Sequence, residues 1–322
     1  MKSTRFAWFA WGVLAFNILV ILWGAFVRAT GSGAGCGSHW PSCQGEMFLW
    51  PDQIETIIEF THRLTSGLAF LLVLAMLIWA IRRYPKGHVV RLGAGLSMVF
   101  MIVESLVGAG LVLFELVAYN TSIARAVVMA IHLVNTFLLL STLTLTAWWA
   151  SGGQPLKIKG QGKLGWALGF GYLGILLLGA SGGVTALGDT LYPAESLTQG
   201  VQQELSSTAH FLVRLRLYHP IIAIATGAYL VGVMAVFNAK RPNPTAKTIA
   251  KVFMGAYFVQ LVFGAFNVIL LAPVWMQIVH LFISDFILIV LVLFIATTFA
   301  QPVPIKESTK DSPFSQGKKV YI

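Results

Sequence analysis

Residues 124–149, ARAVVMAIHLVNTFLLLSTLTLTAWW, decide the class of fold of this chain. The only charged side chain in this stretch is Arg125, near its start. At about 1.5 Å per residue, a helix of this length crosses a hydrocarbon core of about 30 Å. Because lipid offers the backbone no hydrogen-bond partner, the stretch must satisfy its peptide groups internally. It is therefore predicted to be a membrane-spanning helix.

The composition and the other apolar stretches extend this prediction to the whole chain. Hydrophobic residues make up 57% of the 322 residues and charged residues 11%, against about 45–50% and about 25% in soluble domains. The first apolar stretch resembles a signal peptide, but at about 20 residues it is long and has no clear cleavage site, so we expect it to be retained. The expected fold is an all-α membrane protein with eight transmembrane helices. The other seven are predicted at 7–27, 57–81, 92–114, 164–185, 209–238, 249–271 and 275–300.

The positive charges predict how the chain is oriented. A net charge of +10 would suggest a nucleic-acid partner in a soluble protein. Here most Lys and Arg residues lie in short clusters between the spans, so we expect no nucleic acid. With eight spans these clusters all fall on one side, which the positive-inside rule makes cytoplasmic. The chain is thus expected in the cell membrane with both termini in the cytoplasm. The clusters lie at the N-terminus, at 82–91, 157–163 and 240–251, and in the tail.

An internal repeat divides the chain into two halves. Residues 24–33 resemble residues 179–188. Four spans return the chain to the same side of the membrane, so the repeats are parallel rather than inverted. We therefore expect two tandem four-helix bundles, a cytoplasmic linker between them and a polar tail that is disordered. The corresponding segments are 1–150, 164–300, 151–163 and 301–322.

Four of the seven histidines carry the strongest chemical signal, because they lie inside spans. They occupy the second and fourth helix of each half, about 8–15 Å from the outer surface at the helical rise. A single intramembrane histidine can be explained by a hydrogen bond to a neighbouring helix. Four at a matched depth favour two haem sites, since haem iron accepts axial nitrogens from both faces of the ring. The pairs are His62 with His132, and His219 with His280.

A zinc or copper ion would need a third or fourth ligand nearby, and no His, Cys or Asp cluster in the sequence supplies one. Two acids inside the spans remain, Glu104 and Asp285, and Gln260 takes the place of Glu104 in the second half. Each acid could belong to a proton path. An interior residue that is protonated or hydrogen-bonded is the favoured interpretation, because ionisation in lipid is expensive.

The side chains beside the histidines differ between the halves. Glu59 lies one turn before His62 on the same helix face, whereas Arg216 has that place before His219. Glu59 is a candidate for acid–base chemistry, although the helix dipole also favours an acid in a first turn. Four arginines near the same outer level are candidates for pairing with haem propionates or for interfacial anchoring. They are Arg63, Arg125, Arg214 and Arg216.

The two cysteines, Cys36 and Cys43, both lie in the first outer loop. A bridge between them would close a short loop, which chain-entropy estimates value at about 2–3 kcal/mol. The alternative is a redox-active pair that exchanges electrons with a partner above the first haem site. The sequence favours the structural bridge.

Together these residues resemble the haem A synthase family, in the type that bears a cysteine pair. The resemblance rests on RATGSGAGC at 28–36 and on EFTHR at 59–63, and it extends to IHLVNT at 131–136 and GAFNV at 264–268. It covers nearly all of residues 5–300. Two features depart from the family. The later outer loop lacks the second cysteine pair of some relatives, and Pro220 replaces the arginine expected after His219.

The resemblance implies a membrane haem-dependent oxidoreductase that converts a methyl group of haem O into the formyl group of haem A for terminal oxidase assembly. His62 and His132 would bind the iron of the substrate haem, which enters from the lipid bilayer. His219 and His280 would bind a permanent haem b cofactor, and Glu59 would be essential. The expected partners are a haem O synthase and a membrane or extracytoplasmic electron acceptor.

Two other functions would use the same histidines. A dihaem electron-transfer protein that oxidises quinol would hold two haem b groups and no haem O or A. A proton-coupled permease would use the imidazoles as a proton relay and would be colourless when purified.

Overall fold

The computed structural model describes residues 4–47 and 52–300, which are helical apart from turns and short loops. Eight segments are long and apolar enough to cross a membrane, which confirms the predicted fold class and number of spans. The predicted tail at 301–322 lies outside the described residues. The spans are α1 (Arg5–Ala29), α2 (Ile54–Arg83), α3 (Val89–Leu113), α4 (Ile123–Ala150), α5 (Gly162–Leu191), α7 (Phe211–Leu215) with α8 (Tyr218–Lys240), α9 (Pro244–Ile269) and α10 (Val274–Phe299).

The sixth span differs from the single helix predicted at 209–238, because it breaks between α7 and α8. Pro220 explains the break. Proline has no N–H to donate, and its ring collides with the carbonyl four residues earlier, which here belongs to Arg216. Proline is tolerated in the first turn of a helix, where no internal partner is needed. The new start at Tyr218 therefore puts His219 in the first turn of α8.

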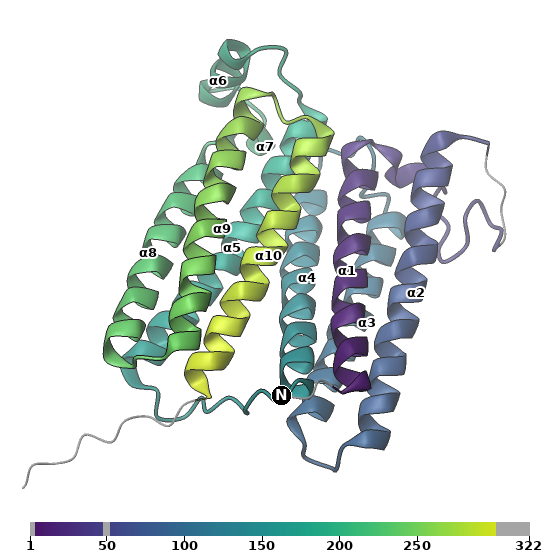
Figure 1. Cartoon of the computed structure of the whole chain (residues 1–322). Helices are drawn as coiled ribbons and strands as arrows, with labels where there is room; N and C mark the ends of the chain where they lie inside the picture. Colours follow the sequence, from purple (N-terminus) through teal and green to yellow (C-terminus); the bar gives the residue numbers. More distant parts are fainter. Residues whose placement is uncertain (1–3, 48–51, 301–322) are drawn as a thin grey trace, which may run out of the picture.

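The outer loop before α7 contains a further helix, which the sequence does not predict. Helix α6 (Leu197–Leu205) begins after Ser196, whose hydroxyl accepts a hydrogen bond from the backbone N–H of Gln199. This is an ordinary N-cap. Figure 1 shows α6 beyond the outer ends of α8 and α9.

The membrane-spanning helices of each half form a ring of four, and Figure 1 shows the two halves side by side. In the first half α1 and α3 each pack against both α2 and α4, so α2 and α4 lie diagonally across the ring. In the second half α5 and α9 each pack against both α8 and α10, which are again diagonal. The diagonal helices are those that carry the four intramembrane histidines.

The two rings meet along α1 and α4 of the first and α5 and α10 of the second. The hydrophobic core follows the inner part of this contact. Helix α4 is buried mainly from Asn135 to Ala150, and α10 mainly from Asp285 to Phe299. The residues of these helices nearer their outer ends are mostly half-buried or exposed. The outer part of each ring, where the histidines lie, is therefore the less densely filled part.

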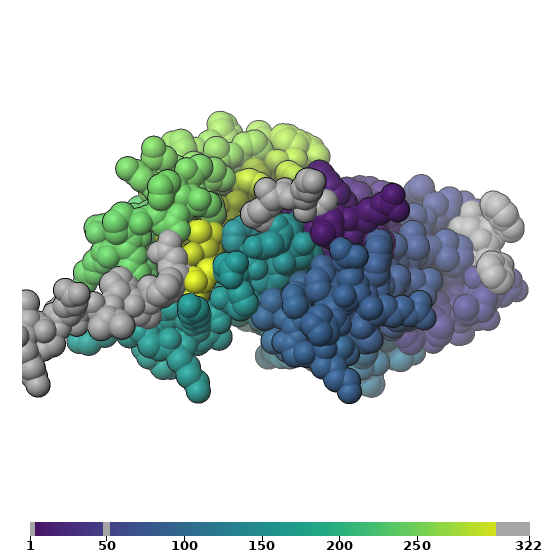
Figure 2. Space-filling model, turned by 60° about the horizontal axis from the view of Figure 1, so that its bottom comes forward, coloured from purple at the N-terminus to yellow at the C-terminus, as the bar shows by residue number. Residues whose placement is uncertain are grey.

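The loops that carry the basic residues all lie at one end of the molecule. The turns at 84–88, 151–161 and 241–243 lie at the same end as the start of α1, and Figure 2 brings this end forward. Four of the clusters of basic residues lie in or beside these segments. The arrangement is the one that the charge pattern requires, and the assignment of this end to the cytoplasm stays a prediction.

Candidate functional site

The four histidines form two pairs, one in each ring. His62 on α2 and His132 on α4 lie across the first ring within range of electrostatic interaction. His219 on α8 and His280 on α10 have the same relation in the second ring. The structure thus brings together the two pairs that the sequence predicts. Whether each pair binds haem iron stays a prediction.

Each imidazole packs against a glycine on the preceding membrane-spanning helix. A Cβ at these glycines would approach Cε1 of the imidazole to between 2.9 and 3.9 Å, and contacts below 3.4 Å are tighter than side chains normally make. Glycine therefore allows the ring to lie directly against a helix backbone. Three of these glycines belong to motifs visible in the sequence, but their role beside the histidines was not predicted. The distances are 2.9 Å for Gly24 and His62, 3.9 Å for Gly108 and His132, 3.0 Å for Gly182 and His219, and 3.2 Å for Gly264 and His280.

The set of possible ligands around each imidazole pair fits a haem. Nδ1 is buried without a hydrogen-bond partner in three of the four rings, those of His62, His132 and His280. The described residues also contain no group of three His, Cys, Asp or Glu side chains that could hold a metal ion. Two imidazoles on diagonal helices, without a third ligand among the described residues, match the axial positions of haem iron better than a four-coordinate zinc site.

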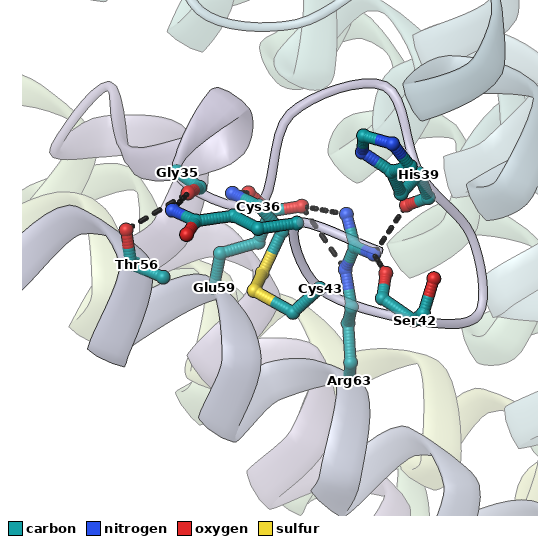
Figure 3. Close-up of polar contacts among 9 residues, drawn as sticks. Gly35, Cys36, His39, Ser42, Cys43, Thr56, Glu59 and Arg63 are labelled. Atoms are coloured by element: carbon teal, nitrogen blue, oxygen red, sulfur yellow. Dashed lines mark hydrogen bonds and ion pairs between the residues drawn. A yellow bond between two sulfur atoms is a disulfide. The ribbon is translucent and has the colours of Figure 1, made fainter. Parts of the chain in front are cut away.

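Glu59 is buried and fixed by two donors (Figure 3). One carboxylate oxygen accepts a hydrogen bond from the backbone N–H of Cys36 at 2.8 Å. The other accepts from the guanidinium of Arg63, one turn further along α2. Arg63 also donates to the backbone carbonyls of His39 and Ser42, at 2.5 Å each. The carboxylate is thus tied to the first outer loop and held in one orientation above His62.

The first outer loop is closed by a disulfide between Cys36 and Cys43, which confirms the predicted bridge. Both cysteines are completely buried. Exchange with a partner needs an accessible sulfur, so this burial favours the structural role. The loop packs tightly on α2, since a Cβ at Gly35 would lie 2.6 Å from the backbone of Glu55. The hydroxyl of Thr56 also donates a hydrogen bond to the carbonyl of Gly35.

The four predicted arginines all bond to the protein itself. Arg125 donates to the carbonyls of Ala118 and Asn120, and Arg214 to those of Ser206 and Ser207. These bonds hold outer loops to helix ends, as does the contact of Arg63 with the disulfide loop. Nothing in these contacts tests a role in binding propionates.

Arg216 forms an ion pair with Asp189 on α5, 2.9 Å between Nε and Oδ1, and donates to the carbonyls of Gly188 and Tyr192. Glu204 on α6 faces the same cluster. Partial burial raises the pKa of the Glu204 carboxyl, while Arg216 opposes this shift and Asp189 adds to it. The outer end of the second ring therefore carries a linked group of acids and bases, where the first ring has the disulfide loop.

Arg28, the first residue of the motif at 28–36, joins the two rings. From the end of α1 it donates to the carbonyl of Ala186 and the hydroxyl of Thr190 on α5, and to the side-chain oxygen of Gln277 on α10, each at 2.7 Å. No periodicity in the sequence predicts these contacts, because the partners belong to the other half of the chain.

The two interior acids have different surroundings. Glu104 accepts hydrogen bonds from Asn135 at 2.6 Å and Thr136 at 2.5 Å, and lies 3.7 Å from Nε2 of His132. This confirms the hydrogen-bonded interpretation for Glu104. Asp285 is completely buried, and neither of its carboxylate oxygens has a partner among the described residues. Gln260 replaces Glu104 in the second ring, where it donates to the carbonyl of His280 and the hydroxyl of Ser284.

Comparison with known proteins identifies one family, while the individual relatives carry two different enzyme names. Residues 7–292 match the profile of the family described as cytochrome oxidase assembly protein. The chain is 54% identical over 295 residues to a protohaem IX farnesyltransferase of Thermus thermophilus, a match that covers 92% of this chain and 48% of that protein. It is 44% identical over 109 residues to a haem A synthase of Geobacillus kaustophilus, covering 33% of this chain and 34% of that one. A haem A synthase of Halalkalibacterium halodurans is 42% identical over 97 residues, 30% of this chain and 33% of the relative. The chain thus spans about half the length of the Thermus relative.

Proposed function

Because the chain belongs to the cytochrome oxidase assembly protein family, we propose that it is a haem A synthase, which oxidises a methyl group of haem O to the formyl group of haem A. The observation that carries this proposal is the presence of two glycine-backed histidine pairs on diagonal helices, one pair in each ring. Two equivalent haem positions let one group serve as substrate while the other serves as a redox cofactor.

The asymmetry between the rings supports an assignment of the two positions. Glu59 lies above His62 in the first ring, where Arg216 occupies the matching place in the second. The Glu59 carboxylate can thus exchange protons only with a haem bound in the first ring, within residues 1–150. We assign His62 and His132 to the substrate haem O, and His219 and His280, within 164–300, to haem b.

The conversion of methyl to formyl removes four electrons from one carbon, in two successive two-electron oxidations, and adds one oxygen atom taken from water or dioxygen. With water as the source, the balance is methyl plus water to formyl plus four protons and four electrons, and the electrons pass to the acceptor. A haem b bound in the second ring supplies a one-electron redox centre. Glu59 contributes by accepting a proton or by stabilising positive charge that develops at the methyl carbon. The N–H of Cys36 and the guanidinium of Arg63 hold that carboxylate in place before the substrate binds, so no reorientation is needed during the reaction.

The partners and the orientation follow from the same proposal. The Thermus relative named protohaem IX farnesyltransferase is about twice as long as its match to this chain. A separate or fused prenyltransferase that makes haem O is therefore a suitable partner for this enzyme. The eight spans make the chain a multi-pass membrane protein. We place it in the cell membrane with its basic loops in the cytoplasm, and we expect a membrane or extracytoplasmic acceptor to take the electrons.

The proposal is tested by measuring the conversion of haem O to haem A in a host that makes no haem A of its own. The chain is produced together with a haem O synthase, and the haems of the membranes are extracted and separated by chromatography. We expect haem A with the unaltered chain and none with His62→Ala or His132→Ala. His88→Ala, at the inner start of α3, is the matched control and should leave haem A unchanged. Absence of haem A from membranes that contain the unaltered, folded protein and haem O would refute the proposal.

A further inference from the structure

The imidazole of His219 differs from the other three in its support. Its Nδ1 lies 2.9 Å from the hydroxyl oxygen of Ser181 on α5. Nδ1 of His62, His132 and His280 has no hydrogen-bond partner among residues 4–47 and 52–300. One of the four rings is therefore fixed by a side-chain hydrogen bond.

The second contact of the hydroxyl favours one direction for this hydrogen bond. Ser181 Oγ also lies 2.8 Å from the backbone carbonyl of Leu178, which can only accept. A hydroxyl has one proton. When Ser181 donates it to Leu178, Ser181 Oγ accepts from His219, whose Nδ1 carries the donated proton. The neutral ring then has an unprotonated Nε2.

An unprotonated Nε2 is the form of imidazole that binds a metal, and a metal-bound histidine commonly donates its other N–H to a protein acceptor. The backbone adds to this fixation. Gly182 follows Ser181 and lets Cε1 of the ring approach α5, and the break before α8 places His219 in a first turn. This arrangement therefore favours one tautomer and holds the ring against one helix before any iron binds.

The first ring has no equivalent of this support. The residue before Gly24 is Trp23, whose indole N–H donates to the backbone carbonyl of Ile58 at 3.1 Å rather than to His62. His62 thus has the glycine contact without the hydrogen bond. Both halves thus place a glycine against the imidazole, although the sequence repeat aligns Gly24 with Gly179 rather than with Gly182, and only the second half adds the hydroxyl acceptor.

We propose that Ser181 is a positioning residue, which fixes His219 as a prepared iron ligand and so makes the second ring the site that retains its haem. The first ring, whose imidazoles lack this support, releases its haem, as a site for substrate and product must. This inference rests on the proposed function, because it explains how one duplicated site becomes a permanent cofactor site.

The test compares Ser181→Val with Ser181→Thr in the purified full-length protein. These side chains have nearly the same volume and differ in the hydroxyl. Loss of haem to excess apomyoglobin is followed by absorbance, and the haems that remain are extracted and identified. Second-shell partners of metal-bound histidines typically change metal affinity about 10-fold to 100-fold. We therefore expect Ser181→Val to lose haem b at least about 10-fold faster than Ser181→Thr. The midpoint potential of haem b should shift, and the electron paramagnetic resonance signal of its ferric form should change.

Ser141→Ala is the matched control, since it removes a hydrogen bond between α4 and α5, the 2.8 Å contact with Tyr172, without touching a histidine. It should leave the rate of haem b loss unchanged. Equal rates and potentials for the Val and Thr variants would overturn the inference while leaving the proposed function intact. An unaltered protein that binds no haem would instead refute the proposed function itself.

Discussion

Glu59 shows most clearly what a single residue contributes to this site. Its buried carboxylate is bound by one backbone N–H from the disulfide loop and by Arg63 from its own helix. The helical spacing of Glu59 and His62 predicts that they share a face. The clamp from Cys36 could not be predicted, because a backbone N–H has no signature in the sequence and its position depends on how the loop closes.

Substitution of Glu59 by Ala should separate haem binding from oxidation. The variant keeps all four histidines, so its content of bound haem should equal that of the unaltered protein. Formation of haem A should fall about 100-fold or more, the range expected for loss of a general acid or base. Both quantities are obtained by extracting and separating the haems after a fixed period of production.

The control for Glu59 lies on the same helix. Glu55→Ala removes an exposed acid from the first turn of α2 and should leave haem A formation unchanged. Normal turnover by Glu59→Ala would sink the assigned role. Loss of bound haem in that variant would make Glu59 a structural residue of the loop.

At the level of helices, the contact between an imidazole and a facing glycine is the repeating unit of the site. It occurs four times, between the first and second and between the third and fourth spans of each half: α1 and α2, α3 and α4, α5 and α8, and α9 and α10. Apolar stretches predict the spans themselves, because lipid imposes both length and helical hydrogen bonding. They do not predict which residues of neighbouring helices are in contact, and hydropathy alone gives no sign of the break before Pro220.

Gly24→Ala tests this unit. The added Cβ would lie 2.9 Å from Cε1 of His62, so the ring must move. We expect the first ring to lose bound haem about 10-fold more readily, with haem b in the second ring retained and thermal stability little changed. Haem types are counted by extraction, and unfolding is followed in detergent by circular dichroism.

Gly12→Ala provides the comparison on the same helix, since a Cβ there has nothing within 4 Å. It should leave both haems in place. Equal haem content in Gly24→Ala and Gly12→Ala would show that the close contact does not position His62.

At the scale of the whole molecule, the two rings form one unit through α1, α4, α5 and α10. The inner part of this contact is hydrophobic, while Arg28 supplies a polar connection at its outer end. The internal repeat and the charge pattern predict two halves and their parallel topology. Contacts between the halves have no repeat to reveal them, which is why Arg28 was recognised only as part of a motif.

Arg28→Met should weaken the connection between the rings. It leaves three acceptors on α5 and α10 without their donor, and hydrogen bonds to charged groups are worth about 1.5–3 kcal/mol each. We expect a lower midpoint of thermal unfolding in detergent. Arg82→Met, which changes an exposed arginine at the inner end of α2, should leave the midpoint unchanged. Identical midpoints for the two variants would exclude a stabilising role for Arg28.

The identity of the haems in the purified protein tests the central claim most directly. The full-length chain is produced with a source of haem O and purified, and its haems are extracted, separated by chromatography and identified by mass. We predict haem b together with haem O or haem A. Haem b alone, in two equivalents, would contradict the claim in favour of an electron-transfer protein, and a colourless protein would contradict any haem function.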